Sequence, residues 1–297
     1  MTRHDPETAR STGTGSDPIQ EGITSAINKH GHAFHQSVLR ETERLFELRT
    51  SKFLFEAAEL PVDVGDQHSR IDAVLKHRDR PTYLVLECKR VDSSTAWCFS
   101  SVPFVRRDNN SHELLFDIFQ RLDEFSGQAI TFSPSLSTER LFELGLPFDS
   151  GKKGDGGGWK DRDDVEKSVS QAILGAAGLI NCMNRNLEII MPREDAMIIP
   201  VVLTTAELYL SGADLSRVNL ESGKMCESEI HPQPIDWLWF RYHASSRISH
   251  PVNRGQYRFA SHELTLSRLL DRDHSKTVAI VNALGLSAFL SYASHVL

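Results

Sequence analysis

The segment Met197 to Thr204, MIIPVVLT, most constrains the fold of this chain, because it is an almost continuous run of apolar residues. A strand that is covered on both faces of its sheet has this pattern, since neither of its sides meets water. Such a sheet needs helices packed on each face. We therefore expect an α/β protein with a mixed central sheet flanked by helices.

The first third of the chain has the pattern of one helix followed by three strands. Residues 34–49 carry a helical stripe, in which the side chains at four-and-three spacing share one face. The stripe consists of Phe34, Val38, Glu41, Leu45 and Leu48. Residues 52–64, 70–76 and 82–91 follow as strands, with a turn from His77 to Pro81 between the last two.

The remaining segments predict three further helical regions and one more strand. A helix is expected from Ser111, with a stripe formed by Leu115, Ile118, Leu122 and Phe125. A long helix is expected over residues 165–184, where one side is small enough to pack closely on a sheet: Ser168, Gly175, Gly178 and Cys182. Residues 235–242 predict a strand. Residues 262–293 predict one or two terminal helices, and the apolar run 278–293 is assigned to a buried helix.

The chain length and two stretches poor in bulky apolar residues suggest how the chain is organised. With 297 residues it can bury a sizeable core, extended by insertions. We expect a mobile N-terminal segment over residues 1–30 and a core over residues 31–205. A large insertion at 93–162, including a flexible glycine-rich loop at 149–164, interrupts that core, and residues 206–297 form a C-terminal extension packed on it.

Composition excludes several classes of protein. The net charge of −7 argues against coating nucleic acid with a globally basic surface, although a local basic groove stays compatible with it. The 4 cysteines lack metal-knuckle spacing and are expected to be free thiols. No apolar run is long enough for a membrane span or a secretory signal, so we expect a cytoplasmic protein without a membrane partner. ATP-binding, dinucleotide-binding and serine-hydrolase motifs are missing from the sequence.

The triplet Glu87-Cys88-Lys89 ends an otherwise apolar strand and is the first candidate for chemistry. Because side chains two apart in a strand point the same way, Glu87 and Lys89 share a face with Val85. Antiparallel pairing across the preceding turn can bring Asp72 beside Glu87. Two carboxylates at one strand edge suit a hard cation such as Mg²⁺ or Mn²⁺, and Lys89 would stand next to it.

A fourth carboxylate, Glu41, lies in the apolar stripe of the first helix and is therefore expected to point at the sheet. Its neighbours Glu43 and Glu47 are rival candidates for the same position. The histidines at positions 30, 32 and 35 are dense enough to suggest a metal site, but no carboxylate or cysteine is in register with them. We do not assign them as ligands.

The order of a helix Glu41, a strand Asp72 and a strand Glu87-Cys88-Lys89, followed by a helix and a strand, resembles the PD-(D/E)XK nuclease superfamily. The resemblance covers residues 34–92 and 163–205, with Ile71 in place of the proline of the motif. It implies a restriction-endonuclease-like core and divalent-metal-dependent cleavage of phosphodiester bonds, DNA before RNA. Some relatives carry a glutamine on the second helix near the active site, and Gln171 is similar in placement.

The resemblance also implies a role for each residue. Asp72, Glu87 and the Cys88 carbonyl would hold Mg²⁺ or Mn²⁺, with Glu41 completing the metal shell or acting through water. Lys89 would orient or help deprotonate a water molecule, or stabilise negative charge on phosphate oxygens. Five arginines that are close in sequence could contact phosphates: Arg78, Arg80, Arg90, Arg106 and Arg107. Restriction, anti-phage defence or repair would suit such an enzyme, as a homo-oligomer or with a partner protein.

Other interpretations stay open at this point. Glu87 and Lys89 can be an exposed ion pair on an edge strand, Asp72 can begin a turn, and Glu41 and Gln171 can be solvated helix residues. The arginines can be solvated loop charges. A non-catalytic module that keeps the fold and binds nucleic acid or a protein is the main rival to a nuclease, and metal binding separates the two. A small-molecule hydrolase is disfavoured because its nucleophile motifs are missing.

Overall fold

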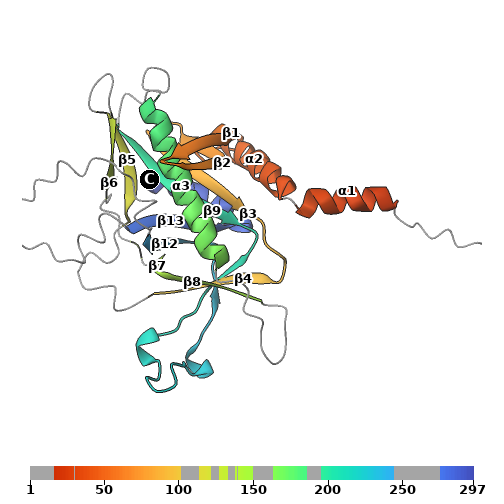
Figure 1. The fold of residues 1–297 in the computed structure, drawn as a ribbon, viewed down its shortest axis with the longest axis vertical. Coiled ribbons are helices and arrows are strands. Elements are labelled where there is room, and N and C mark those ends of the chain that lie inside the picture. Colours follow the sequence, from red (N-terminus) through yellow and green to blue (C-terminus); the bar gives the residue numbers. More distant parts are fainter. Residues whose placement is uncertain are drawn as a thin grey trace, which may run out of the picture.

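The computed structural model describes residues 17–29, 31–101, 114–121, 127–132, 138, 140–149, 163–185, 195–243 and 275–297 (Figure 1). Within these ranges the chain forms a large mixed sheet with helices on both of its faces, together with a smaller second sheet. The expected α/β class with a mixed central sheet flanked by helices is confirmed. Residues 1–16 and 150–162, which include most of the segments expected to be flexible, lie outside the described residues.

The large sheet has nine strands in the order β1-β2-β3-β9-β13-β12-β7, and β5 pairs with β9 and β6. β3, β9 and β13 are mutually parallel neighbours, whereas β1 and β2 form an antiparallel hairpin that continues into β3. Its strands are β1 Phe53–Val64, β2 Gln67–His77, β3 Thr82–Lys89, β5 Phe116–Arg121, β6 Gly127–Phe132, β7 Leu141–Phe142, β9 Ala196–Thr204, β12 Trp237–His243 and β13 Ser275–Asn282.

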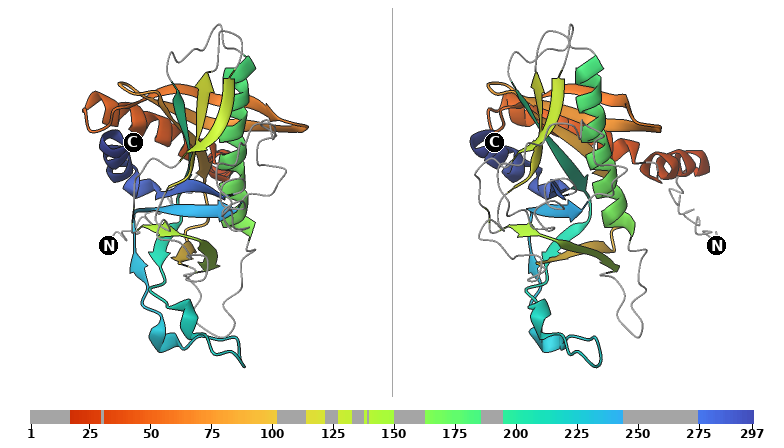
Figure 2. Two further views of the ribbon diagram at one scale, coloured as in Figure 1. Left: turned by 90° about the vertical axis from the view of Figure 1, so that its left-hand side faces the viewer. Right: turned by 60° about the vertical axis from the view of Figure 1, so that its left-hand side comes forward.

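Helices cover the two faces of this sheet (Figure 2). α2 (His32–Glu47) and α6 (Leu286–Val296) pack on one face, where Val38 and Phe289 join a core cluster with Leu84 and Val201. α3 (Asp163–Arg185) covers the other face. The sequence-predicted helices at 34–49 and 165–184 and the strand at 197–204 are confirmed. α1 (Pro18–Lys29) extends away from the body of the molecule (Figure 1).

Small residues let α3 approach the sheet closely, as the sequence predicts. A Cβ atom built on Gly178 would lie 2.5 Å from the side chain of Val62 in β1. At Gly175 a Cβ atom would lie 3.2 Å from Val85 of β3, and Ser168 is fully buried. Any larger side chain at position 178 would therefore push the helix away from β1.

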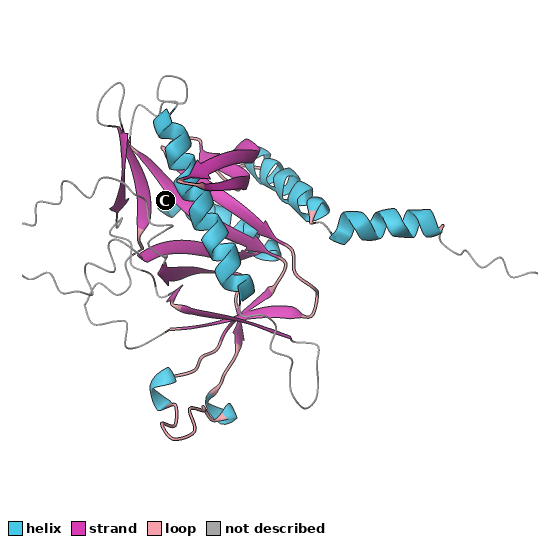
Figure 3. Ribbon diagram, viewed as in Figure 1, coloured by secondary structure: helices cyan, strands magenta, loops and turns pink. Residues whose placement is uncertain are grey.

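The smaller sheet contains four strands in the order β11-β10-β4-β8. Trp97 and Phe99 of β4 pack against Val165 and Val169, at the beginning of α3. An extended arm leaves this sheet after β10 and returns in β11, with the short 3-10 turns η2 (Leu215–Arg217) and η3 (Glu227–Glu229) along it (Figure 3). The strands are β4 Thr95–Ser100, β8 Leu144–Asp149, β10 Glu207–Leu210 and β11 Gln233–Pro234.

The helix expected from Ser111 is wrong where the chain is described. Residues 116–121 form β5, which pairs antiparallel with β6 and with β9. A stripe at three-and-four spacing is weak evidence over so short a stretch, and the strand buries Phe116 and Phe119 while the stripe residues Leu115 and Ile118 are only partly buried. Pairing with β9 satisfies the backbone here, and Phe116 and Phe119 have side chains that pack well on a sheet.

The terminal region predicted as helical is also partly wrong. Residues 275–282 form β13, which lies directly beside β9 in the sheet, and only Leu286–Val296 forms a helix, after the 3-10 turn η4 (Ala283–Gly285). Val278, Ile280 and Val281 are fully buried and β-branched, which favours a strand. Residues 206–297 are therefore not an appendage on a finished core, since β12 and β13 belong to the main sheet. The segment 93–162 likewise contributes β5, β6 and β7 to it.

Two predictions, one about the cysteines and one about membrane-spanning segments, can be compared with the structure. All four cysteines are free thiols, as expected: Cys88, Cys98, Cys182 and Cys226. Among the described helices, none is long and apolar enough to span a membrane.

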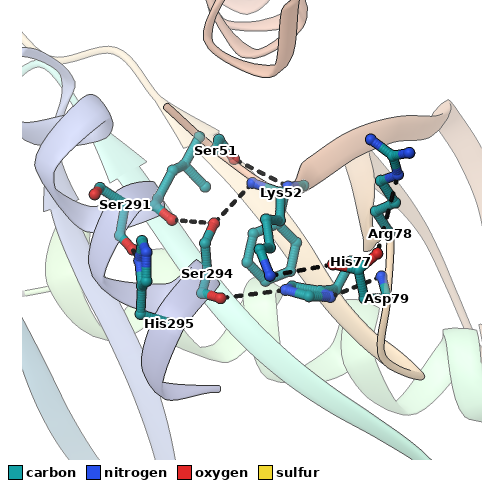
Figure 4. Close-up of polar contacts among 10 residues, drawn as sticks. Ser51, Lys52, His77, Arg78, Asp79, Ser291, Ser294 and His295 are labelled. Carbon is teal, nitrogen blue, oxygen red and sulfur yellow. Dashed lines mark hydrogen bonds and ion pairs between the residues drawn. The ribbon is translucent and has the colours of Figure 1, made fainter. Parts of the chain in front are cut away.

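A buried polar contact fixes α6 to the β1–β2 hairpin (Figure 4). The hydroxyl of Ser294 donates to the carbonyl of Leu290 and accepts from the backbone N–H of Lys52 at 2.8 Å. His77 is fully buried, and its Nε2 lies 3.3 Å from the Ser294 carbonyl. Its Nδ1 accepts a hydrogen bond from the backbone N–H of Asp79 at 3.1 Å. The ring is therefore neutral, with its proton on Nε2.

Stability should fall as the pH drops below 6.5 because of His77. Burial lowers the pKa of His77, and the charges of Arg80 and Lys52 lower it further against the opposing effects of the Ser294 carbonyl and Asp79. The unfolded chain then binds a proton that the folded protein excludes, so the free energy of unfolding decreases by at most about 1.4 kcal/mol per pH unit. Thermal unfolding from pH 7.5 to 5.5 should show a flatter profile for His77→Gln than for the native protein. The exposed His68→Gln serves as a control, and a native slope in His77→Gln would contradict the assignment.

Candidate functional site

The carboxyl ends of three parallel strands meet at one edge of the sheet. Lys89 at the end of β3 pairs with Thr204 of β9, and Thr204 pairs with Asn282, the last residue of β13. Ligands of open α/β sheets commonly bind outside this edge, where the strands end and the chain changes direction. Glu87, Cys88 and Lys89 therefore lie at the edge of the sheet where a site is expected.

The hairpin brings Asp72 beside β3, as the sequence predicts. β2 and β3 pair antiparallel with Ala73 opposite Leu86, and the same register continued by one residue places Asp72 opposite Glu87. The Asp72 carboxylate also accepts a hydrogen bond from the backbone N–H of Cys88, with Oδ2 at 2.7 Å from the nitrogen. The carboxylate of Asp72 therefore accepts a backbone hydrogen bond from β3 at the point where β2 and β3 stop pairing.

Burial makes both carboxylates reluctant to ionise. Burial raises the pKa of Glu87 to about 8, and the negative charge of Asp72 contributes to the rise while Lys89 opposes it. Burial also raises the pKa of Asp72, despite the hydrogen bond from Cys88. The pKa of the Cys88 thiol is raised well above its usual value by burial and by the carboxylates around it, so that thiol is not a nucleophile. A pair of this kind holds a proton or needs a cation nearby.

Lys89 has a partner that the sequence did not indicate. Its Nζ lies 3.5 Å from Oδ1 of Asp164, in the first turn of α3. Alternation along β3 places Glu87 and Lys89 on the face covered by α3, together with Tyr83 and Val85 of the same core cluster. The sequence places Asp164 at the end of a flexible loop. The acidic pair Asp163-Asp164, directly before a helical stripe, is the one sequence feature that indicates a helix start at this position.

Glu41 does not join these residues. The buried side of α2 runs through His35, Val38, Thr42 and Leu45, so the stripe passes through Thr42 instead of Glu41. The Thr42 hydroxyl donates to the carbonyl of Val38 and is satisfied inside the helix, whereas a buried carboxylate would need a charged partner. Glu41 is half-buried, lies 2.6 Å from Arg44, and its pKa is lowered mainly by that hydrogen bond. Glu43 and Glu47, the rival candidates for the buried position, are exposed.

A second group of residues that the sequence did not connect lies against Asp72. The Nε2 atom of His35 is 2.8 Å from the backbone oxygen of Asp72, and its Nδ1 is 3.0 Å from Oε1 of Glu59. Arg70 lies 2.7 Å from the other oxygen of Glu59. His35 was set aside because no carboxylate seemed to be in register with it. The sequence does not indicate Glu59 as the partner of His35, because this contact depends on an irregularity in β1.

The residues proposed to contact nucleic acid are not gathered around this edge. Arg78 and Arg80 lie in the turn before β3, at the other end of that strand, which spans about 23 Å from Thr82 to Lys89 at the usual rise per residue. Arg90 follows Lys89 directly and is exposed, and Gln171 is an exposed residue of α3. Arg106 and Arg107 lie outside the described residues. Of these residues, Arg90 is the one adjacent to the cluster in the chain.

Neither the geometry of side chains nor similarity to known proteins identifies this site. In the described part of the chain, no group of three or more His, Cys, Asp or Glu side chains is arranged to hold a metal ion. Comparisons with family models, with curated proteins and with solved structures found no match for this chain. The arrangement of Asp72, Glu87 and Lys89 must therefore be interpreted from its own chemistry.

Replacing Glu87 with glutamine should stabilise the protein at alkaline pH. Between its usual pKa of 4.5 and about 8, native Glu87 keeps a proton that the unfolded chain has lost, so the free energy of unfolding decreases as pH rises through this range. The neutral amide removes that dependence. Glu87→Gln should exceed the native protein by about 1 to 3 kcal/mol at pH 8.5, with a much smaller difference at pH 4.5, in urea denaturation.

Glu41→Gln is the matched control, because Glu41 is ion-paired near the surface and its pKa is lowered. Its effect should stay within about 0.5 kcal/mol of the native protein and should not grow with pH. If Glu87→Gln lost stability at pH 8.5, or kept the native pH dependence, Glu87 would not be a buried carboxylate with a raised pKa.

Proposed function

We propose that this protein is a divalent-metal-dependent nuclease with a restriction-endonuclease-like core, acting on DNA in preference to RNA. The observation that supports this best is the placement of Asp72 beside Glu87, with Lys89 on the same strand, at the carboxyl edge of parallel strands. The order of elements around them, α2-β1-β2-β3 and then α3-β9, is the order on which the sequence resemblance rests. Restriction, anti-phage defence or repair in the cytoplasm is the setting that this proposal suits.

The residues present fit a Mg²⁺ or Mn²⁺ ion. Asp72 and Glu87 offer hard oxygen ligands, and the Cys88 carbonyl would be the third, so the donor set is the kind these ions prefer. Burial raises the pKa of both carboxylates, and the charge of Asp72 adds to the rise at Glu87, so a bound cation would offset the cost of ionising them. Two carboxylates are enough for Mg²⁺, which usually keeps several waters and shares phosphate oxygens of its substrate. When bound, the ion would polarise the scissile phosphate and lower the pKa of a water.

Lys89 supplies a positive charge to this site from the protein itself. An ammonium two residues from Glu87 on the same face can donate hydrogen bonds to phosphate oxygens as negative charge builds on them, or orient the attacking water. Asp164 forms an ion pair with this ammonium at 3.5 Å. A substrate phosphate would compete with Asp164 for the same cation.

Cleavage and metal binding should separate in single variants. Asp72→Ala or Glu87→Ala deletes an anionic ligand, so each should abolish Mn²⁺ binding measured by calorimetry and lower cleavage about 100-fold or more. Lys89→Ala should lower cleavage to a similar extent but keep or tighten Mn²⁺ binding, because it removes a nearby positive charge. Folding should survive in all three.

The substrates are plasmid, linear and single-stranded DNA, and RNA, each with Mg²⁺, with Mn²⁺ or with EDTA, which should stop cleavage. Lys52→Ala is the control for Lys89→Ala, because Lys52 is also ion-paired to an aspartate, at 3.1 Å, but lies at the far end of the hairpin. Full cleavage by Lys89→Ala, or native metal affinity in Asp72→Ala, would overturn this chemistry.

The rival proposal is a non-catalytic module that keeps this fold and binds nucleic acid or a partner protein. Two observations favour it: the described side chains include no group of three metal-binding residues, and Lys89 is already engaged by Asp164. The same calorimetric titration decides between the two, since a degenerate module would bind no Mn²⁺ in its native sequence. A second copy of the chain or a partner protein fits either proposal.

A further inference from the structure

Asp72 is held by contacts at both its backbone and its side chain. Its carboxylate accepts from the Cys88 N–H in β3, and its carbonyl lies 2.8 Å from Nε2 of His35 in α2. His35 is buried, with 6% of its surface exposed, and its other nitrogen faces Glu59 at 3.0 Å. Arg70 in turn holds Glu59 at 2.7 Å. A continuous chain of polar contacts therefore connects the surface of the hairpin to the backbone of Asp72.

An irregularity in β1 makes this chain of contacts possible. Ala58 pairs with Ala73 and Leu60 pairs with Ile71, but Glu59 between them has a φ of +53°, in the left-handed region that side chains other than glycine rarely adopt. Strained backbone of this kind persists where surrounding contacts hold it, and it is concentrated at functional sites. Here the strained residue carries the carboxylate that holds His35.

Neither nitrogen of His35 faces an open position. A backbone carbonyl and a carboxylate are both acceptors, so each ring nitrogen of His35 is directed at an acceptor, and the ring N–H can donate to one of them. The ring thus fills the space between Glu59 and Asp72 instead of offering a lone pair to a ligand. We propose that His35 and Glu59 are positioning residues, which set the orientation of the Asp72 carboxylate by holding its backbone carbonyl.

The chemical meaning of this inference rests on the proposed function, but the positioning itself can be measured without metal or substrate. Protein labelled with ¹⁵N-cysteine has four backbone amide signals, from the 4 cysteines of the chain. The signal of Cys88, identified by its loss in Cys88→Ser, reports the hydrogen bond that its N–H donates to Asp72. Any change in the direction of the carboxylate should move it.

His35→Ala should shift the Cys88 signal while the signals of Cys182 and Cys226 stay in place, and should weaken Mn²⁺ binding about 10- to 100-fold. His35→Gln places an amide N–H where Nε2 lies and should restore the native signal. Glu59→Gln, which keeps the packing and removes only the charge, should move the signal in the same direction as His35→Ala. His68→Ala is the matched control, because His68 also contacts a carboxylate of the same hairpin, Asp63 at 2.6 Å, but is exposed.

The outcomes distinguish this inference from the proposed function. If the Cys88 signal moves in His35→Ala but the native protein binds no Mn²⁺, the positioning role stands and the nuclease proposal fails. If the native protein binds Mn²⁺ and the signal does not move in either His35→Ala or Glu59→Gln, the positioning role is overturned. Complete loss of Mn²⁺ binding in His35→Ala with an unmoved signal would make His35 a ligand and would also overturn it.

Discussion

β9 is buried on both faces, and the rest of the structure follows from that constraint. Its apolar side chains contribute to the core under α2 and α6 on one face and to the core under α3 on the other. Because the strand cannot be exposed on either side, helices must cover both of its faces, and β3 and β13 lie parallel beside it. Three strands then end at one edge of the sheet, where the chain has to leave the core. Polar residues can be placed there without disturbing the apolar layers.

The charged residues at that edge are only partly removed from water, which explains their unusual chemistry. Glu87 is buried enough for its pKa to rise to about 8, yet Lys89 and Asp164 keep about a third of their side-chain surface exposed. Lys89 offsets part of this effect at Glu87, and Arg70 offsets part of it at Asp72. A buried acidic pair opposes folding and is typical of functional sites, which is why our functional proposal rests on it.

The sequence predicted those parts of the fold and site that depend on a local repeat. The double-sided burial of β9, the small residues of α3 and the placement of Asp72 beside Glu87 all follow from alternation, hairpin register or helical spacing. β5 and β13 were mistaken for helices because a short apolar run fits both periods, and only pairing with β9 decides between them. Glu41 and Thr42 differ by one position on α2, and solvation of the carboxylate selects Thr42 for the interior. The contact of His35 with Glu59 could not be predicted, because it depends on an irregular residue within a strand.

The smaller sheet has a consequence for the main one. Asp164 is the residue directly before Val165, and Val165 is fixed by Trp97 and Phe99 in β4. The position of Asp164 is thus set by packing in the four-stranded sheet, while its charged partner Lys89 belongs to the nine-stranded sheet. α3 packs against both sheets and connects them. A partner that bound the small sheet and shifted it would also move Asp164, the ion-pair partner of Lys89. Such a partner would alter the charge at the carboxyl edge of the main sheet without contacting that edge.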